Sequence, residues 1–177
     1  MTTKLFDLEA WLAGTERKVH REGDRVRSVE VSRRFDAPIE KVWTAWVEGW
    51  KTRIVSGEPE RGATVVLELG QPERTTSRIL VCDPPRRLTA TWTYGDPTDV
   101  RPDEVDVRIE EDGQGTRLTL VHTSESGAPW ADGVGAGWEA GLLMFDFLFR
   151  GEDPSVIPPD ANPRLDALWT ELVGRRG

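Results

Sequence analysis

The sequence predicts an α+β fold in which one curved antiparallel β-sheet wraps around a long helix near the carboxyl end. Segments between residues 63 and 123 alternate apolar and polar residues with period two and are joined by short turns, which is typical of an antiparallel meander. A strand and a helix precede them. Residues 137–149, "GWEAGLLMFDFLF", are apolar over most of a helical circumference. Such a helix needs cover on several sides, and the apolar face of a sheet supplies it.

Length and charge narrow the classes of function. The chain has 177 residues, a net charge of −8 and 31% charged residues. One domain with small additions fits this length. An acidic balance argues against nucleic acid or an anionic membrane as the partner, since both bind basic patches. The opening lacks the pattern of a signal peptide, and no segment reaches the ~20 apolar residues of a membrane span. We therefore expect a cytoplasmic protein.

An N-terminal helix and hairpin extension is expected over residues 1–27. Leucines at helical spacing predict a short helix over 3–13, which Gly14 can end. Gly23 and Asp24 then predict a hairpin turn. The second arm of this hairpin alternates, and its apolar face carries Val29, Val31 and Phe35.

The segment "DAPIEKVWTAW" predicts the next helix. Asp36 can cap it, Pro38 suits its first turn, and Glu40 lies near its positive end. Its apolar face carries Val42, Trp43, Trp46 and Trp50.

Alternation sets the inward face of each later strand. In the strand that ends at the breaker "DPP" we expect Val81 to face inward and Cys82 outward. "RLTATWTY" places Trp92 and Tyr94 on its inward face. "TRLTLVHT" places inward, in phase with one another, Leu118, Leu120 and His122.

The long apolar helix has one mostly polar stripe, formed by Glu139, Leu143, Asp146 and Arg150. The opposite face carries Gly141, Met144, Phe145 and Leu148, and Trp138 and Leu142 widen it. "GVGAG" at 133–137 is interpreted as a flexible rim. Residues 151–177 are expected to form a Pro-rich linker and an amphipathic helix over 162–173, with Asn162 able to cap it.

Four pieces of the sequence resemble the START-like, helix-grip superfamily, also called SRPBCC. They are "RRFDAPIEKVWTAW", "ILVCDPPRRLTATW", "GQGTRLTLVHT" and "GAGWEAGLLMF", in the family's order over roughly residues 28–150. The branch they resemble is similar to the C-terminal domain of the activator of the ninety-kilodalton heat-shock protein's ATPase. The resemblance implies a strand–helix–helix–strands–helix fold with a cavity between sheet and last helix. It also implies binding of lipids, polyketides or other apolar molecules, and in some members cyclase or dehydratase activity.

The candidate ligand-binding residues are those expected to face this cavity. His122 is either a polar fixture in the cavity or a strand-end histidine bonded to backbone. An inward Arg33 would need a carboxylate from protein or ligand, unless a bulge lets it reach water. The aromatic and apolar candidates could equally be plain core; they are Trp92, Tyr94, Leu118, Trp138, Leu142, Met144 and Phe145.

No catalytic residue, metal site or cofactor is expected. Cys82 is a single cysteine with no histidine near it in sequence, and no metal-binding spacing or phosphate-binding glycine loop is present.

Three functions remain open. The first is binding of a hydrophobic or amphipathic small molecule, namely a lipid, a polyketide or an aromatic metabolite. The second is an interaction module that stimulates a chaperone ATPase, although full-length activators carry a further N-terminal domain for which 177 residues leave no space. The third is a cyclase or dehydratase, for which His122 has no evident carboxylate partner. The terminal helix could also join two copies of the chain into a homodimer.

Overall fold

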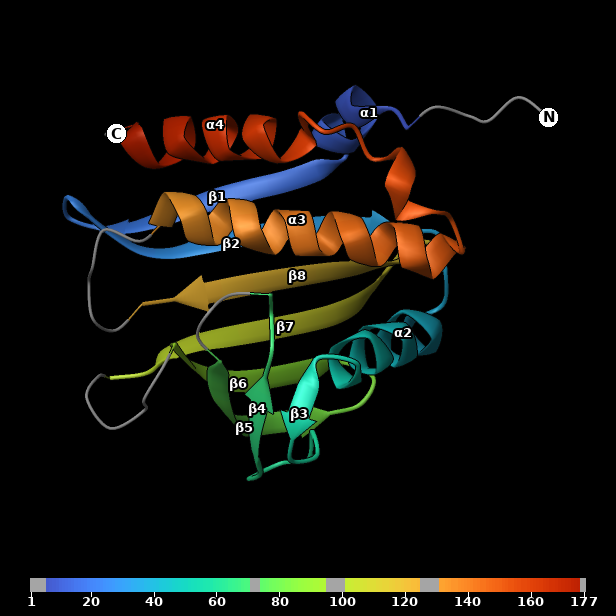
Figure 1. Ribbon diagram of the computed structural model, residues 1–177, viewed down its shortest axis with the longest axis vertical. Helices are drawn as coiled ribbons and strands as arrows, with labels where there is room; N and C mark the ends of the chain where they lie inside the picture. The colour runs from blue at the N-terminus through green and yellow to red at the C-terminus, as the bar shows by residue number, and fades with distance from the viewer. Residues whose placement is uncertain (1–5, 71–73, 95–100, 125–130, 176–177) are drawn as a thin grey trace.

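Eight antiparallel strands form one curved sheet in the order β1-β2-β8-β7-β6-β5-β4-β3 (Figure 1). The structure is a computed structural model that describes residues 6–70, 74–94, 101–124 and 131–175, without the side chains of 131 and 132. The strands are β1 Thr15–Glu22, β2 Arg25–Phe35, β3 Ile54–Ser56, β4 Thr64–Leu67, β5 Thr75–Asp83, β6 Arg87–Tyr94, β7 Asp103–Asp112 and β8 Gly115–Thr123.

Two helices pack on the same face of this sheet. The long helix α3 (Ala131–Arg150) crosses it near β2 and β8, and α2 (Ile39–Lys51) lies beside it toward β7 (Figure 1). The other helices are α1 Leu8–Ala13, the 3-10 turn η1 Pro154–Val156 and α4 Ala161–Gly174. The α+β helix-grip prediction is confirmed, because a curved antiparallel sheet holds one long C-terminal helix.

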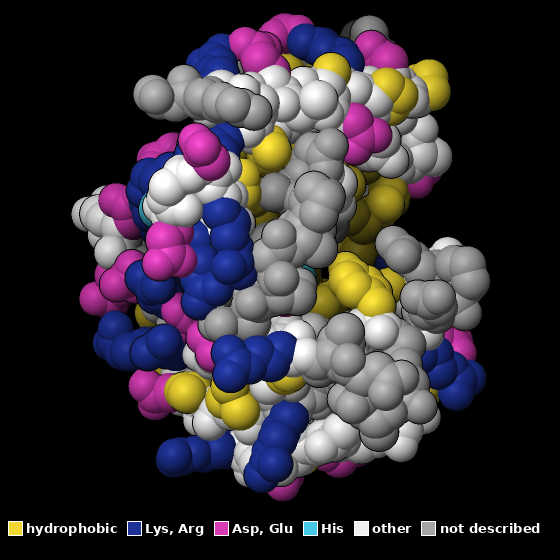
Figure 2. Space-filling model, turned by 90° about the vertical axis from the view of Figure 1, so that its left-hand side faces the viewer, with side chains coloured by type: hydrophobic (Ala, Val, Ile, Leu, Met, Phe, Trp, Pro, Cys, Tyr) yellow, Lys and Arg dark blue, Asp and Glu magenta, His cyan; other side chains and the backbone are white. Residues whose placement is uncertain are grey.

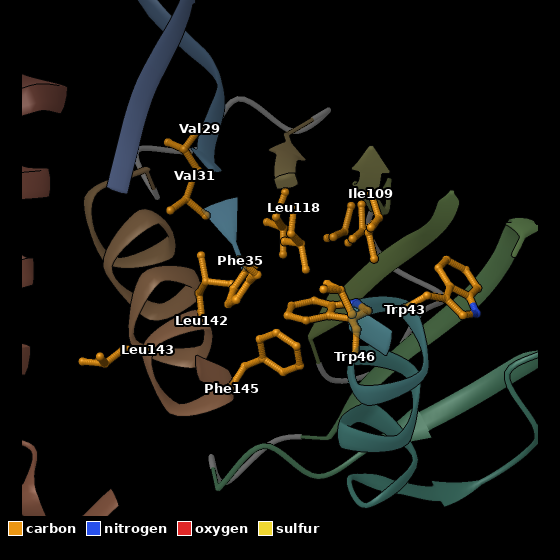
Figure 3. Close-up of a cluster of buried hydrophobic side chains, with 14 of the residues drawn as sticks. Val29, Val31, Phe35, Trp43, Trp46, Ile109, Leu118, Leu142, Leu143 and Phe145 are labelled. Atoms are coloured by element: carbon orange, nitrogen blue, oxygen red, sulfur yellow. The ribbon is translucent and has the colours of Figure 1, made fainter. Parts of the chain in front are cut away.

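Aromatic side chains join α2, α3 and the sheet at the centre of the core. Phe35 of β2, Trp46 of α2 and Phe145 of α3 point toward one another (Figure 3). The ring centroids of Phe35 and Phe145 are 5.4 Å apart, and those of Trp46 and Phe145 are 5.2 Å apart, both edge to face. Edge-to-face pairs of this kind add to the free energy of apolar burial.

Helix α3 begins earlier than the sequence indicated. "GVGAG" lies within the first turns of α3, so its interpretation as a flexible segment is wrong, although three of its residues do line the cavity described below. Glycine is a poor helix former, but packing can outweigh that cost. Gly135 shows how: a Cβ there would lie 2.3 Å from the Trp169 ring of α4. The missing side chain allows α3 and α4 to approach closely.

Three other expectations are altered by local structure. A register shift in β5 between Ile79 and Val81 reverses the alternation, so Cys82 packs against the core and Val81 does not. A bulge of this kind moves later side chains to the other face. Asp36 does not cap α2 but pairs with Arg34. After α2 the described chain enters β3 instead of the second helix that the resemblance implied.

The mostly polar stripe of α3 lies inside the protein. Glu139 is 0% exposed, and its carboxylate accepts hydrogen bonds from the Arg17 guanidinium, with Nε 2.7 Å from Oε2. It also accepts from the indole Nε1 atoms of Trp11, at 3.1 Å, and Trp169, at 2.8 Å. These donors come from β1, α1 and α4. We call this group of four residues the Glu139 cage; it fastens the two terminal segments to α3.

The terminal helices α1 and α4 therefore lie beside α3, on the side away from α2 (Figure 1). The hairpin prediction is confirmed, and β1 pairs along β2 as part of the main sheet. Trp11 and Trp169 are almost completely buried, and Leu143 points from α3 to the side opposite Leu142 and Phe145 (Figure 3). Within the described chain, no helix has the length and apolar character needed to cross a membrane.

Candidate functional site

A cavity of about 620 Å³ opens between α2, α3 and the sheet. Hydrophobic side chains gather in a hollow on the face shown in Figure 2. The walls are mainly aromatic and aliphatic. Its lining residues are Trp46, Gly49, Trp50, Thr52, Arg53, Leu69, Trp92, Tyr94, Gly133, Val134, Gly137, Trp138, Gly141, Met144, Phe145 and Leu148. A cavity of this size falls within the range of small-molecule sites.

One stripe of α3 forms a whole wall of the cavity. Gly133, Gly137 and Gly141 lie four residues apart, and a Cβ on any of them would meet no heavy atom of the described residues within 4 Å. Met144 and Leu148 continue the stripe, and Leu148 is 61% exposed. Among residues 133–149 of α3, only these five positions are exposed, and the others are buried or half-buried. The last residue of the helix, Arg150, is also exposed. The glycines thus keep the cavity open where larger side chains would fill it.

A smaller void of about 50 Å³ lies behind the main cavity, against β4–β7. The two spaces share four lining tryptophans, Trp46, Trp50, Trp92 and Trp138, and are therefore neighbours. The rings are in contact, with centroids of Trp92 and Trp138 4.9 Å apart and of Trp50 and Trp92 5.9 Å apart. This void we call the inner void.

Three residues that line the inner void each carry a buried polar atom with no hydrogen-bond partner among the described residues. These atoms are Nε1 of Trp46, Nε1 of Trp92 and Oγ of Ser77. An unsatisfied buried donor costs about 1–3 kcal/mol. Most buried polar groups in proteins are paired, so three such groups on residues around one space are unusual.

His122 lies below the cavity wall in a polar chain. It is 0% exposed, its Nδ1 accepts a hydrogen bond from Trp138 Nε1 at 2.8 Å, and its Nε2 lies 3.1 Å from Asp103 Oδ2. Because an indole can only donate, Nδ1 is the acceptor and Nε2 carries the proton toward Asp103. The expectation that His122 lacks a carboxylate partner is wrong. These two contacts of its ring nitrogens are to side chains, and the one with Nε1 of Trp138 fixes the position of that ring.

Five of the predicted site residues line the cavity: Trp92, Tyr94, Trp138, Met144 and Phe145. Tyr94 lies at the end of β6 and is 43% exposed, so it belongs to the rim of the cavity and not to its interior.

Four predicted site residues do not line the cavity. Leu118 and Leu142 are buried in the core, and His122 is separated from the cavity by Trp138. Arg33 lies on the other side of α3, with its guanidinium 3.9 Å from the centre of the Trp11 ring. It donates to the Trp11 carbonyl and the Thr15 hydroxyl, and burial lowers its pKa. Its direct contacts are a cation–π contact and neutral acceptors, while the carboxylates of Asp146 and Glu139 act on it electrostatically without an ion pair to it.

Sequence reasoning missed several lining residues. Helical spacing predicts Trp46 and Trp50 on the apolar face of α2 but does not mark them as site residues, and Gly133, Gly137 and Gly141 recur every four residues on α3. That spacing, on a helix apolar elsewhere, was the signal that could have found the wall. Arg53 is the one charged side chain among the described residues that line the cavity.

Nucleophilic and metal chemistry find little support in the described chain. Burial raises the pKa of the Cys82 thiol, and nearby Asp83 and Glu60 raise it further, which disfavours the reactive thiolate. The described residues contain no group of three or more histidine, cysteine, aspartate or glutamate side chains placed to hold a metal ion.

Comparison with known proteins assigns the family. The family model described as "Activator of Hsp90 ATPase homolog 1-like protein" matches residues 36–148. The chain belongs to this family. The START-like assignment is thereby confirmed. The match spans α2 through most of α3, including the helical elements and strands that line the cavity. No curated protein sequence matches the chain.

Solved structures of similar fold include CalU16 from Micromonospora echinospora. Its crystal structure matches with a TM-score of 0.69 and 31% identity, over 91% of this chain and 99% of that chain. Its solution structure matches with a TM-score of 0.66 and 28% identity, over 98% of each. The Aha1 dimer from Colwellia psychrerythraea has a TM-score of 0.59 at 16% identity, over 71% of this chain and 98% of that one, and shows the fold alone.

Proposed function

We propose that the protein binds an apolar or amphipathic small molecule, such as a lipid, a polyketide or an aromatic metabolite, in the cavity between α2, α3 and the sheet. The observation that carries the proposal is the cavity of about 620 Å³ with a glycine wall and an aromatic lining. Burial of apolar ligand surface supplies roughly 25 cal/mol per Å². Arg53 lies among the lining residues and would favour a ligand with an acidic group beside it.

A thermal-shift screen tests the proposal. Fatty acids, flavonoids and aromatic polyketides are added to the wild type and to Gly137→Leu, whose new side chain points into open space. A ligand of the cavity raises the melting temperature of the wild type, because it binds only the folded state. Gly137→Leu should fold normally but lose that response. If no compound stabilises the wild type, or if the variant responds equally, binding in this cavity is wrong.

An interaction module is the second candidate function. The family description and the exposed apolar rim, where Leu148 and Met144 lie, support a protein partner. Pull-down with the ninety-kilodalton chaperone and measurement of its ATPase rate test this candidate. Leu148→Glu should abolish capture if the rim is the contact, and capture that is unaffected would exclude the rim. Light scattering on the same samples tests a homodimer.

Cyclase or dehydratase activity is supported only by the His122–Asp103 pair. Both ring nitrogens of His122 already contact other side chains, and Trp138 separates it from the cavity. The pair therefore fits the positioning of Trp138 better than proton transfer to a ligand.

A further inference from the structure

The three unpartnered polar atoms belong to residues that line the inner void and are almost completely buried. The exposed fractions are 5% for Trp46, 6% for Trp92 and 2% for Ser77. The three residues come from α2, β6 and β5, which are distant in sequence, yet all three line the same void. Three unpartnered polar groups on residues around one void are the starting point for a polar subsite within an otherwise apolar interior.

The chemistry of these atoms defines their complement. An indole Nε1–H can only donate, whereas a serine hydroxyl can donate and accept. Two fixed donors and one hydroxyl are matched by a hydrogen-bond acceptor such as an oxygen atom. The faces of neighbouring rings accept only weak hydrogen bonds from an N–H group, so the contacts among the tryptophans do not replace an oxygen acceptor.

The charge of that acceptor follows from the surroundings. The described residues that line the inner void carry no charged side chain, and Ser77 is its one hydroxyl. Transfer of a carboxylate or phosphate to such a place would be very costly without a cation. A ketone, quinone or lactone oxygen is neutral and avoids that cost.

The shape of the ligand follows from the shared tryptophans. Trp46 and Trp92 line both the inner void and the main cavity, so a ligand that fills the main cavity contacts both side chains. Contacting rings favour a flat aromatic body through offset or edge-to-face stacking. Ordered water can occupy the void of the free protein, and a ligand oxygen gains affinity only if it reproduces the hydrogen bonds of that water.

We propose that the inner end of the cavity is an acceptor subsite, in which Trp46 and Trp92, aided by Ser77, bind the neutral carbonyl oxygen of a planar aromatic ligand. The subsite rests on the proposed function, since the ligand must first enter the main cavity. It adds a polarity requirement that cavity size and apolar lining do not impose.

The matched probes 9-fluorenone and fluorene test this subsite, because they share a planar skeleton and differ by one carbonyl oxygen. Tryptophan-fluorescence titration should give about 5- to 10-fold tighter binding of fluorenone to the wild type, as expected for one buried hydrogen bond. Trp46→Phe and Trp92→Phe should each reduce that ratio toward one while fluorene binding changes little. Trp50→Phe is the control, since Trp50 lines both spaces but is not one of the three unpartnered groups.

A second readout does not depend on the folding of the variants. In wild-type protein with ¹⁵N-labelled tryptophan, fluorenone should move the Nε1–H proton signals of Trp46 and Trp92 downfield, and fluorene should not. Equal affinities and equal signal shifts for the two probes would overturn the acceptor subsite and leave the proposed function standing. Binding of neither probe would overturn the acceptor subsite for a planar aromatic ketone, whereas the proposed function is overturned only by the thermal-shift screen. A ratio that falls as much in Trp50→Phe as in the other two variants would also overturn the subsite.

Discussion

One side of α3 packs against α1, β1 and α4 so closely that Gly135 has no space for a Cβ, whereas the other side faces a cavity of about 620 Å³. The packed side carries the buried Glu139 and Asp146, and the cavity side carries glycines and the exposed Leu148. The usual amphipathic arrangement is thereby reversed. Because contacts with α1, β1 and α4 stabilise α3 on its packed side, the helix stays in position although its other side faces a cavity.

The largest expected effect comes from removal of the Glu139 carboxylate. Glu139→Ala leaves the Arg17 guanidinium buried without its counter-ion and two indole donors without acceptors. We expect a loss of about 3–5 kcal/mol in the free energy of unfolding, measured by urea denaturation. The control is Glu152→Ala, which removes an exposed partner of Arg150 and should change stability by less than about 0.5 kcal/mol. Similar losses in the two variants would mean that the cage contributes no special stability.

Two glycines on α3 provide the sharpest test of the two sides. Gly135→Ala forces a methyl group against Trp169 and should destabilise the protein by about 1–3 kcal/mol. Gly137→Ala places the same methyl group in open space and should stabilise it by roughly 0.5–1 kcal/mol, since alanine is the better helix former. Thermal or urea unfolding of both variants measures the difference. Effects of the same sign would contradict the contrast between a packed side and a hollow one.

The hollow side has one buried polar anchor, the contact between Trp138 and His122. Trp138→Phe keeps an aromatic ring at the cavity but leaves His122 Nδ1 without its donor. We expect a loss of about 1 kcal/mol in unfolding free energy beyond that of Trp50→Phe, which lacks this contact. A smaller loss than in Trp50→Phe would show that His122 does not stabilise the Trp138 ring through this bond.

Asp106 in β7 lies away from α3, and a variant of this residue serves as a comparison for the variants on the two sides of that helix. Burial would raise its pKa, but hydrogen bonds from Arg87, Arg108 and Thr89 outweigh it and hold the pKa below the ordinary value of 3.8. A depressed carboxyl pKa contributes stability above the unfolded-state value, and this is lost as pH falls from about 4 through the folded-state value. Asp106→Asn should therefore show a weaker fall in stability over that acid range, measured by unfolding at a series of pH values. It should leave cavity binding at neutral pH unchanged, and an unchanged acid profile would contradict the assignment.

The fold could be predicted from the sequence because strands with period-two alternation, an amphipathic helix and a strongly apolar helix are all local patterns. The sequence did not predict which side of α3 is packed and which side faces a cavity. Glu139 looks like part of a wet stripe until Arg17, 122 residues away, is placed beside it. Tertiary contacts of this range have no local signal, and a buried carboxylate is recognisable only from its partners.

The candidate site was predicted in part for the same reason. Alternation identified Trp92 as inward, and helical spacing placed Met144 and Phe145 on the face that the cavity occupies. Alternation cannot detect the bulge in β5 that turns Cys82 inward, nor the pairing of β7 with β8 that brings Asp103 within reach of His122. Both depend on register between strands and not on the pattern within one.

The Glu139 cage also bears on the order of assembly. Trp11 and Arg17 are synthesised early, Glu139 later, and Trp169 last, so on a growing chain the carboxylate meets its final donor only after α3 has been made. Folding proceeds from the first-made residues as the chain emerges. We expect nascent α3 to rest on the sheet with one flank uncovered, and chaperones to contact the protein during that interval.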